Sequence, residues 1–260
     1  MVSIIETVIF GLVQGLTEWL PVSSSGHLAF LQSFFDWEPP TIFYVLLHLG
    51  TLSVIVMYFR KDIWRVFGAL TRRDFNSEEG KLGFFVVFGN IPTAAIGYIF
   101  QDLFESFFSN LFVVSIAFFV TGFLLFITKR RVGDNRALNY LDSLLLGVAQ
   151  GIAIIPGVSR SGATISTGLL RGINRKVTVK FSFLLSIPAI LGALIATSNE
   201  LNLLVSGEDV LAMLVGVVVS MIVGYLSLKA LMRAVMNQKF HWFAFYCWIM
   251  GTLIIFSQTL

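Results

Sequence analysis

The chain has 260 residues, of which 56% are hydrophobic and 13% are charged, and its mean hydropathy is +0.84. Soluble domains carry about 25% charged residues, so this composition excludes a water-soluble globular protein and indicates a chain that crosses a membrane several times. The single cysteine, Cys247, excludes an internal disulfide and a cysteine-based metal cluster, and the net charge of +3 says little until the basic residues are placed along the chain.

Ten apolar segments alternate with polar connections. Most are long enough to form a membrane-spanning helix, which needs about 20 residues. Two of them, 24–35 and 161–170, are too short, and each follows a polar stretch rich in Pro, Gly and Ser, which stop one helix and cap the next. The segments are 2–20, 24–35, 41–59, 82–101, 110–128, 138–158, 161–170, 177–197, 209–228 and 241–258.

The basic residues predict the orientation of these segments. Of the 18 Lys and Arg residues, all except Arg160 lie in the four connections 60–81, 129–136, 171–180 and 229–239. Cytoplasmic loops are enriched in Lys and Arg, so these four connections are expected to be cytoplasmic. The remaining connections are expected to face outside because they carry acidic residues and no basic ones, namely Asp36, Glu38, Asp102, Glu105, Glu200, Glu208 and Asp209.

The second short segment lies between two cytoplasmic connections. The stretch 138–170 must therefore cross the membrane an even number of times, and the ten residues of 161–170 cannot span it. We expect a re-entrant helical hairpin that enters from the cytoplasm and returns, with both of its ends cytoplasmic. Non-helical backbone at that depth is tolerated only where it is buried in protein or lines a watery cavity.

The chain also repeats itself. An ungapped offset of 136 residues aligns Gly11 with Gly147, Gln14 with Gln150, Gly15 with Gly151, Val22 with Val158, Ser23 with Ser159, Ser25 with Ser161 and Gly26 with Gly162. A fainter echo aligns Ile96-Gly97-Tyr98 with Val223-Gly224-Tyr225.

The repeat predicts the architecture. Residues 1–260 form a single membrane domain with repeat 1 at 1–136 and repeat 2 at 137–260, each containing one re-entrant hairpin and three transmembrane helices. Three is odd, so the second repeat is inserted upside down, and the fold class is an all-α polytopic membrane protein with an inverted-topology repeat. The first hairpin then enters from outside, and both termini lie outside.

The two polar stretches indicate a phosphate site. Each precedes a short helix, whose first N–H groups and partial positive charge favour an anion. Arg160 adds a permanent, fork-shaped donor that matches phosphate oxygens. Hydroxyl donors are expected from Ser159, Ser161 and Thr164 in the second stretch, and from Ser23 and Ser25 in the first.

The first stretch also carries groups suited to chemistry. The hydroxyl of Ser24 needs a base before it can attack phosphorus, and the imidazole of His27 can supply one. The carboxylate of Glu18 can orient that imidazole or hold a divalent cation, Mg²⁺ or Ca²⁺. Gln14 lies four residues before Glu18, so both side chains share one helical face and are expected to face the same cavity, with Gln14 contacting the substrate. Of the other histidines, His48 either lines the cavity or packs within a spanning helix.

Residues 18–27 (EWLPVSSSGH) and 156–164 (PGVSRSGAT) resemble the paired signatures of the undecaprenyl-diphosphate phosphatase family, the bacitracin-resistance membrane phosphatases. Residues 48–52 (HLGTL) and the pair Ile91-Pro92 resemble its secondary motifs. The similarity covers essentially the whole chain. It implies a plasma-membrane enzyme that removes the terminal phosphate of a polyprenyl diphosphate at the outer face, and so recycles a lipid carrier for cell-envelope glycans.

The resemblance also implies site residues. Glu18, Ser24, His27 and Arg160 match its catalytic positions, and Ser159 and Thr164 match further active-site positions. Some members carry a glutamate where this chain has Gln14, so a metal ion here would depend on Glu18 and the phosphates of the substrate. The resemblance leaves open whether Ser24 forms a phosphoenzyme or His27 activates water.

Two other functions remain open at this stage. Inverted repeats are common in transporters, so a polyprenyl-phosphate flippase is the alternative to a phosphatase. A catalytically inactive homologue is the weaker alternative, suggested by Gln14. The expected partners are the lipid substrate and membrane lipids, with no nucleic acid, and a homodimer is left open.

Overall fold

The computed structural model describes residues 4–37, 39–130, 136–197 and 207–258, with the side chains of Arg130 and 207–209 excepted. The predictions made for Glu38, Arg131 and Glu200, and for the side chains of Glu208 and Asp209, lie outside this description. Within the described ranges the chain is helical and contains no strand, only an isolated bridge between Arg136 and Ile173.

Five helices are long and apolar enough to cross a membrane, and a bent pair makes a sixth candidate span. These six coincide with the six spanning segments predicted from the sequence, and an all-α polytopic membrane protein is thereby confirmed. The five are α3 (Thr41–Tyr58), α5 (Glu78–Ile99), α10 (Arg175–Ala196), α11 (Gly207–Met236) and α12 (Phe243–Ser257), which follows a 3₁₀ turn at Phe240–Trp242. The pair is α6 (Gln101–Phe108) and α7 (Leu111–Ile127), bent by 101°.

Four shorter helices form two hairpins. Helix α1 (Ile4–Trp19) packs against α2 (Ser24–Phe35), and α8 (Tyr140–Ile152) packs against α9 (Arg160–Leu170). The loops between them, 20–23 and 153–159, lie within the two polar stretches. Each loop requires a left-handed residue, Ser23 at φ 64° and Gly157 at φ 98°.

Several boundaries differ from those predicted. Helix α8 stops at Ile152 rather than at 158, because Pro156 lacks an N–H and Gly157 is left-handed, so the apolar residues before them belong to the loop. Helix α11 continues to Met236 instead of ending at 228, since the residues of the basic connection are themselves good helix formers. Two short helices were not predicted, α4 (Arg60–Thr71) and α6, and a 3₁₀ turn covers Thr128–Arg130.

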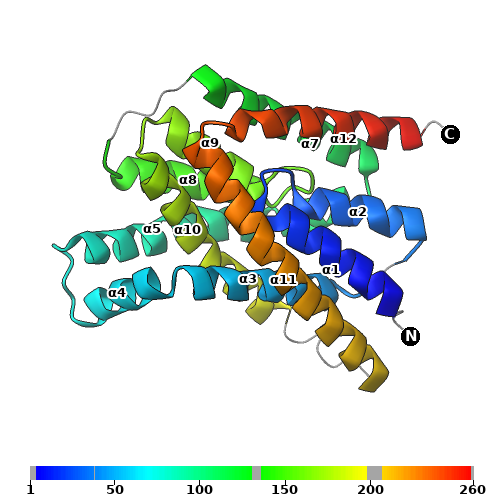
Figure 1. The fold of residues 1–260 in the computed structure, drawn as a ribbon, viewed down its shortest axis with the longest axis horizontal. Coiled ribbons are helices and arrows are strands. Elements are labelled where there is room, and N and C mark those ends of the chain that lie inside the picture. Colours follow the sequence, from blue (N-terminus) through cyan, green and yellow to red (C-terminus); the bar gives the residue numbers. More distant parts are fainter. Residues whose placement is uncertain (1–3, 38, 131–135, 198–206, 259–260) are drawn as a thin grey trace.

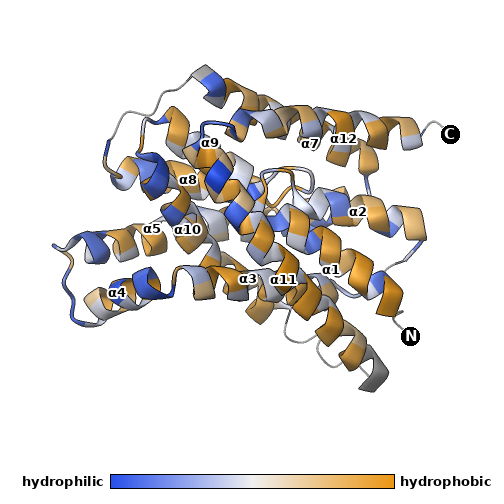
Figure 2. Ribbon diagram, viewed as in Figure 1, coloured by the Kyte–Doolittle hydropathy of each residue, from blue (hydrophilic) through white to orange (hydrophobic). Residues whose placement is uncertain are grey.

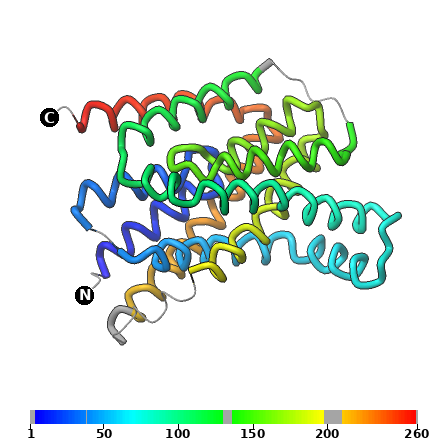
Figure 3. Tube along the Cα trace, turned by 180° about the vertical axis from the view of Figure 1, so that it is seen from behind, coloured from blue at the N-terminus to red at the C-terminus, as the bar shows by residue number. Residues whose placement is uncertain are grey.

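The helices cross at the hairpin loops (Figure 1). Helix α1 lies along α11, α7 lies along α12, and the loops of both hairpins lie between these pairs. The beginning of α1 and the end of α12 lie at the same end of the molecule, opposite the connection between α4 and α5, in both views (Figures 1 and 3). Hydrophilic residues are frequent at that opposite end, on α4 and at the beginning of α5 (Figure 2).

The ends of the second hairpin are tied together at the basic connections. The buried Asp142 carboxylate, at the beginning of α8, accepts hydrogen bonds from Arg136 at 2.8 Å and from Arg171 at 2.9 Å. The Arg136 guanidinium also donates to the Arg171 carbonyl oxygen, and a capping box joins Asn139 to Asp142. The chain therefore leaves the hairpin where it entered, as a hairpin inserted from one side requires.

Glycines let the main chains of four helices touch. A Cβ on Gly11 of α1 would lie 2.7 Å from the Gly216 carbonyl oxygen of α11, and a Cβ on Gly147 of α8 would collide with the Gly89 carbonyl oxygen of α5. Small residues permit such close approach between membrane helices. Gly11 and Gly147 are related by the offset of 136, and Gly89 and Gly216 by that of Gly97 and Gly224. Each contact therefore joins a helix of one half to a helix of the other, and the two contacts correspond to each other through these offsets.

We expect Gly147→Ala to destabilise the protein by about 1–3 kcal/mol, because the added methyl group overpacks two main chains that cannot move apart independently. The matched control is Gly68→Ala in α4, where a Cβ meets nothing within 4 Å. Thermal unfolding in detergent measures both variants. An unchanged melting temperature for Gly147→Ala would contradict the packing described.

Asp142 gives a pH-dependent prediction. Burial alone would raise the pKa of its carboxyl group, but hydrogen bonds from Arg136 and Arg171 outweigh burial and hold the pKa below its ordinary value. A lowered pKa stabilises the fold above the unfolded-state pKa of about 4, and this contribution is lost as the pH falls through the folded-state value. Asp142→Asn should therefore melt below the wild type at pH 7, with the difference shrinking in acid. A difference independent of pH would contradict this account.

Candidate active site

The loops of the two hairpins meet and hold each other. The Gly157 N–H donates to the Ser23 hydroxyl at 3.0 Å, and the Ser161 hydroxyl donates to the Leu20 carbonyl oxygen at 3.3 Å. Gly26 lies so close to Gly157 that a Cβ on Gly26 would be 2.8 Å from the Gly157 Cα. Residues far apart in the sequence are thereby brought into one polar cluster among apolar helices.

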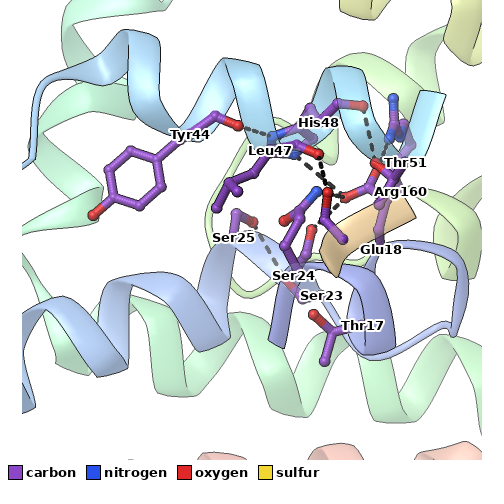
Figure 4. A network of polar contacts seen from close by, with 12 residues as sticks. Thr17, Glu18, Ser23, Ser24, Ser25, Tyr44, Leu47, His48, Thr51 and Arg160 are labelled. Atoms are coloured by element: carbon purple, nitrogen blue, oxygen red, sulfur yellow. Dashed lines mark hydrogen bonds and ion pairs between the residues drawn. The ribbon is translucent and has the colours of Figure 1, made fainter. Parts of the chain in front are cut away.

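Glu18 lies at the centre of this cluster (Figure 4). Its Oε2 accepts hydrogen bonds from Gln14 at 3.0 Å and from the Ser24 hydroxyl at 2.6 Å, and it lies 3.3 Å from His48 Nε2. Its Oε1 forms an ion pair with Arg160. The Glu18 side chain is 2% exposed, whereas those of Arg160 and His48 are 19% and 25% exposed. An incoming anion therefore meets the guanidinium and the imidazole before it meets the carboxylate.

The beginnings of α2 and α9 also contribute. Ser23 caps α2 by accepting from the Gly26 N–H, and Ser159 caps α9 by accepting from the Gly162 N–H. Within the described ranges, the N–H groups of the first two residues of each helix have no hydrogen-bond partner. Such groups are the donors that helix N-termini offer to phosphate.

The other predicted residues lie around this centre. His27 faces α12: its Nδ1 is 2.7 Å from the Ser23 carbonyl oxygen and its Nε2 is 2.7 Å from the Tyr246 hydroxyl. Ser25 is half-buried, and its hydroxyl oxygen lies 3.2 Å from the Ser23 hydroxyl oxygen. Thr164 is fully buried, and its hydroxyl donates to the Arg160 carbonyl oxygen at 2.8 Å and lies 2.5 Å from the Ser182 hydroxyl of α10. The structure therefore brings together Gln14, Glu18, Ser24 and Arg160, and gives His27 and Thr164 other partners.

Two residues of the cluster were not among the predicted site residues. His48 contacts Glu18 from α3, and its place in a motif of the resemblance was the only available signal. Tyr246 contacts His27 from α12 across 219 residues of sequence, and no signal in the sequence pointed to it.

The residues present do not fit a resident divalent cation. Such ions need several oxygen ligands, usually more than one of them a carboxylate. The cluster offers one carboxylate, Glu18, whose Oε2 already accepts from Gln14 and Ser24 and whose Oε1 pairs with Arg160. In the part of the chain that the structure describes, no three His, Cys, Asp or Glu side chains are grouped to hold a metal ion.

Comparisons with known proteins find similarity to one family over nearly the whole chain. Residues 7–253 match the family described as "Bacitracin resistance protein BacA". The undecaprenyl-diphosphatase of Carboxydothermus hydrogenoformans is 42% identical, with 97% of each chain covered. Proteins with the same name from Methanobrevibacter smithii and Korarchaeum cryptofilum are 38% and 39% identical, with 98% and 97% of this chain and 98% of each relative covered.

A second carboxylate should create the missing cation site. We expect Gln14→Glu to bind Mn²⁺ at least roughly tenfold more tightly than the wild type, because two adjacent carboxylates supply the charge that Glu18 alone lacks. Titration followed by electron paramagnetic resonance measures this. The matched control is Gln101→Glu, where an exposed Gln101 also donates to a carboxylate four residues on, Glu105. Equal Mn²⁺ affinity in the wild type and Gln14→Glu would contradict the assessment of the donor set.

Proposed function

The chain belongs to the bacitracin resistance protein BacA family, and on that premise we propose that it is a membrane phosphatase. Its substrate is undecaprenyl diphosphate or a similar polyprenyl diphosphate. The products are the lipid carrier monophosphate and inorganic phosphate. The names of the relatives support the reaction and the lipid class, and the Glu18 cluster supports the chemistry.

One observation carries the proposal: the Ser24 hydroxyl donates to Glu18 at 2.6 Å beside the guanidinium of Arg160. In this mechanism Glu18 accepts the Ser24 proton as Oγ attacks the terminal phosphorus. The bond from that phosphorus to the bridging oxygen breaks, and its electron pair leaves with the polyprenyl monophosphate. Water then releases phosphate from Ser24. The direct contact with Glu18 favours this route over attack by water activated by His27.

Arg160 and the helix N-termini bind the phosphate oxygens. Arg160 pairs with Glu18 in the absence of substrate, so its guanidinium is held beside the nucleophile. The free N–H groups at the beginnings of α2 and α9 add uncharged donors. His27 supports the site by bracing the Ser23 carbonyl, through which the loop is fixed to α12. Ser23 and Ser159 cap α2 and α9, and Ser23 and Ser161 join the two loops.

We place the site in the plasma membrane, open toward the outer face. The basic connections, which include both ends of the second hairpin, are cytoplasmic by the positive-inside rule. The position of the α4–α5 connection opposite the beginning of α1 and the end of α12 agrees with this orientation (Figure 1). The headgroup then docks between the hairpin loops, and the isoprenoid tail extends into the lipid.

A polyprenyl-phosphate flippase is the second candidate. The recurring glycine contacts, Gly11 with Gly216 and Gly147 with Gly89, favour it because two-fold repeats suit alternating access. Transport needs no nucleophile, however, and gives no role to a serine hydroxyl that is hydrogen-bonded to a carboxylate. Release of phosphate in detergent, where there is no membrane to cross, supports the enzyme. Lipid movement across liposomes without phosphate release supports the flippase.

Arg160→Ala should lower phosphate release from a polyprenyl diphosphate at least roughly 100-fold, because it removes the charged donor for the phosphate and leaves Glu18 without its ion-pair partner. The control is Arg65→Ala, an exposed arginine of α4. Phosphate release is measured in detergent on folded protein, checked by thermal unfolding. Wild-type turnover by Arg160→Ala would reject the assignment of this site.

A further inference from the structure

His48 contacts Glu18 and is a titratable group to which the proposed reaction gives no role. It lies in α3, and its Nε2 is 3.3 Å from Glu18 Oε2. The rotation of α3 is fixed at this level, since Gly50 packs against the main chain of α11 and Ser220 donates to the Leu47 carbonyl oxygen at 3.1 Å. The approach of His48 to Glu18 is therefore set by helix packing.

The other ring nitrogen identifies the tautomer. His48 Nδ1 lies 2.8 Å from the Tyr44 carbonyl oxygen. A carbonyl oxygen can only accept a hydrogen bond, so Nδ1 carries a proton. In a neutral ring Nε2 then has a lone pair, and an ionised Glu18 carboxylate also has only lone pairs to present. Their approach is favourable only if one proton lies between them, carried by the imidazole or by the carboxyl group.

The other charged groups near His48 and Glu18 do not compete for this proton. Arg160 of α9 pairs with the other carboxylate oxygen, Oε1. Of the other helices packed on α3, α10 from Phe181 to Ala196 and α11 from Val210 to Leu228 contain no acidic, basic or histidine residue. Helix α1 carries one further charge, Glu6, about three helical turns before Glu18. The charges of α4 begin at Arg60, about three helical turns beyond His48.

We propose that His48 and Glu18 share one proton and that His48 is the proton relay of the reaction. This inference rests on the proposed phosphatase function. The pair begins as imidazolium and carboxylate. As Ser24 Oγ bonds to the terminal phosphorus, its proton passes to Glu18 Oε2, and His48 Nε2 gives its proton to the departing bridging oxygen. The pair then holds a carboxyl group and a neutral imidazole, so one shared proton remains.

The second half of the cycle restores the first state. Water attacks the phosphoserine, and His48 Nε2 accepts the proton that the water loses. The bond between phosphorus and Ser24 Oγ breaks, and Oγ regains a proton from Glu18. Inorganic phosphate leaves, and imidazolium and carboxylate are restored. His48 suits this exchange because its side chain is 25% exposed, whereas that of Glu18 is 2% exposed.

The test is the variant His48→Gln, whose amide can still donate to Glu18 but cannot carry a proton through the cycle. We expect kcat for a polyprenyl diphosphate to fall roughly 100-fold with KM changed less than threefold. The dependence of kcat on pH near neutrality should also disappear. The matched control His241→Gln, at the turn before α12 where His241 packs on Trp242, should keep the wild-type values.

The outcomes separate this inference from the proposed function. If the wild type releases no phosphate, the proposed function fails. If the wild type is active and Arg160→Ala is not, a wild-type kcat and pH profile in His48→Gln overturns the inference alone. A lowered melting temperature together with an unchanged pH profile also overturns it, because His48 would then be only structural.

A second measurement does not depend on activity. The chain has three histidines, so ¹⁵N-histidine labelling gives few signals, and comparison with His48→Gln assigns those of His48. We expect a protonated Nδ1 throughout the neutral range. An unprotonated Nδ1 in His48 would overturn the inference.

Discussion

A carboxylate within the membrane domain is stable only if charged or hydrogen-bonding partners replace the water it has lost, and this requirement governs the centre of the molecule. Glu18 belongs to the first hairpin and Arg160 to the second, so their ion pair joins the two halves at the level of the loops. Removing Arg160 is costly, because it leaves the buried Glu18 carboxylate without the guanidinium that pairs with its Oε1. Because Ser24 and Arg160 both contact Glu18, a substrate phosphate that binds Arg160 lies close to the Ser24 hydroxyl.

The packing of the helices serves the same meeting point. The glycine contacts of α1 with α11 and of α8 with α5 bring the hairpins inward, and Thr121 of α7 holds the Gly157 carbonyl and the Ser159 N–H of the second loop. Asp142 joins the two ends of the same hairpin, away from its loop, by pairing with Arg136 and Arg171. Backbone contacts to several helices thus hold the reacting groups in position, although the loops that carry the site have little regular structure.

Some of this could be predicted from sequence and some could not. Hydropathy and the placement of Lys and Arg are properties of the chain in order, so they predicted six spans and two short hairpins. Arg160 stood out because it is the one basic residue outside the basic connections. The partner of Ser24 could not be predicted, because Ser24 and His27 share a helix whose rotation is decided by packing. That rotation turns the His27 ring toward the Tyr246 hydroxyl and lets the Ser24 hydroxyl donate a hydrogen bond to Glu18.

The most direct test of the central claim is an experimental structure of the protein with vanadate, which mimics phosphate during transfer. The account predicts vanadium bonded to Ser24 Oγ, with Arg160 donating to the vanadate oxygens and Glu18 beside the same hydroxyl. Vanadate bound elsewhere, or bound between the hairpin loops without contact to Ser24 and Arg160, would contradict it.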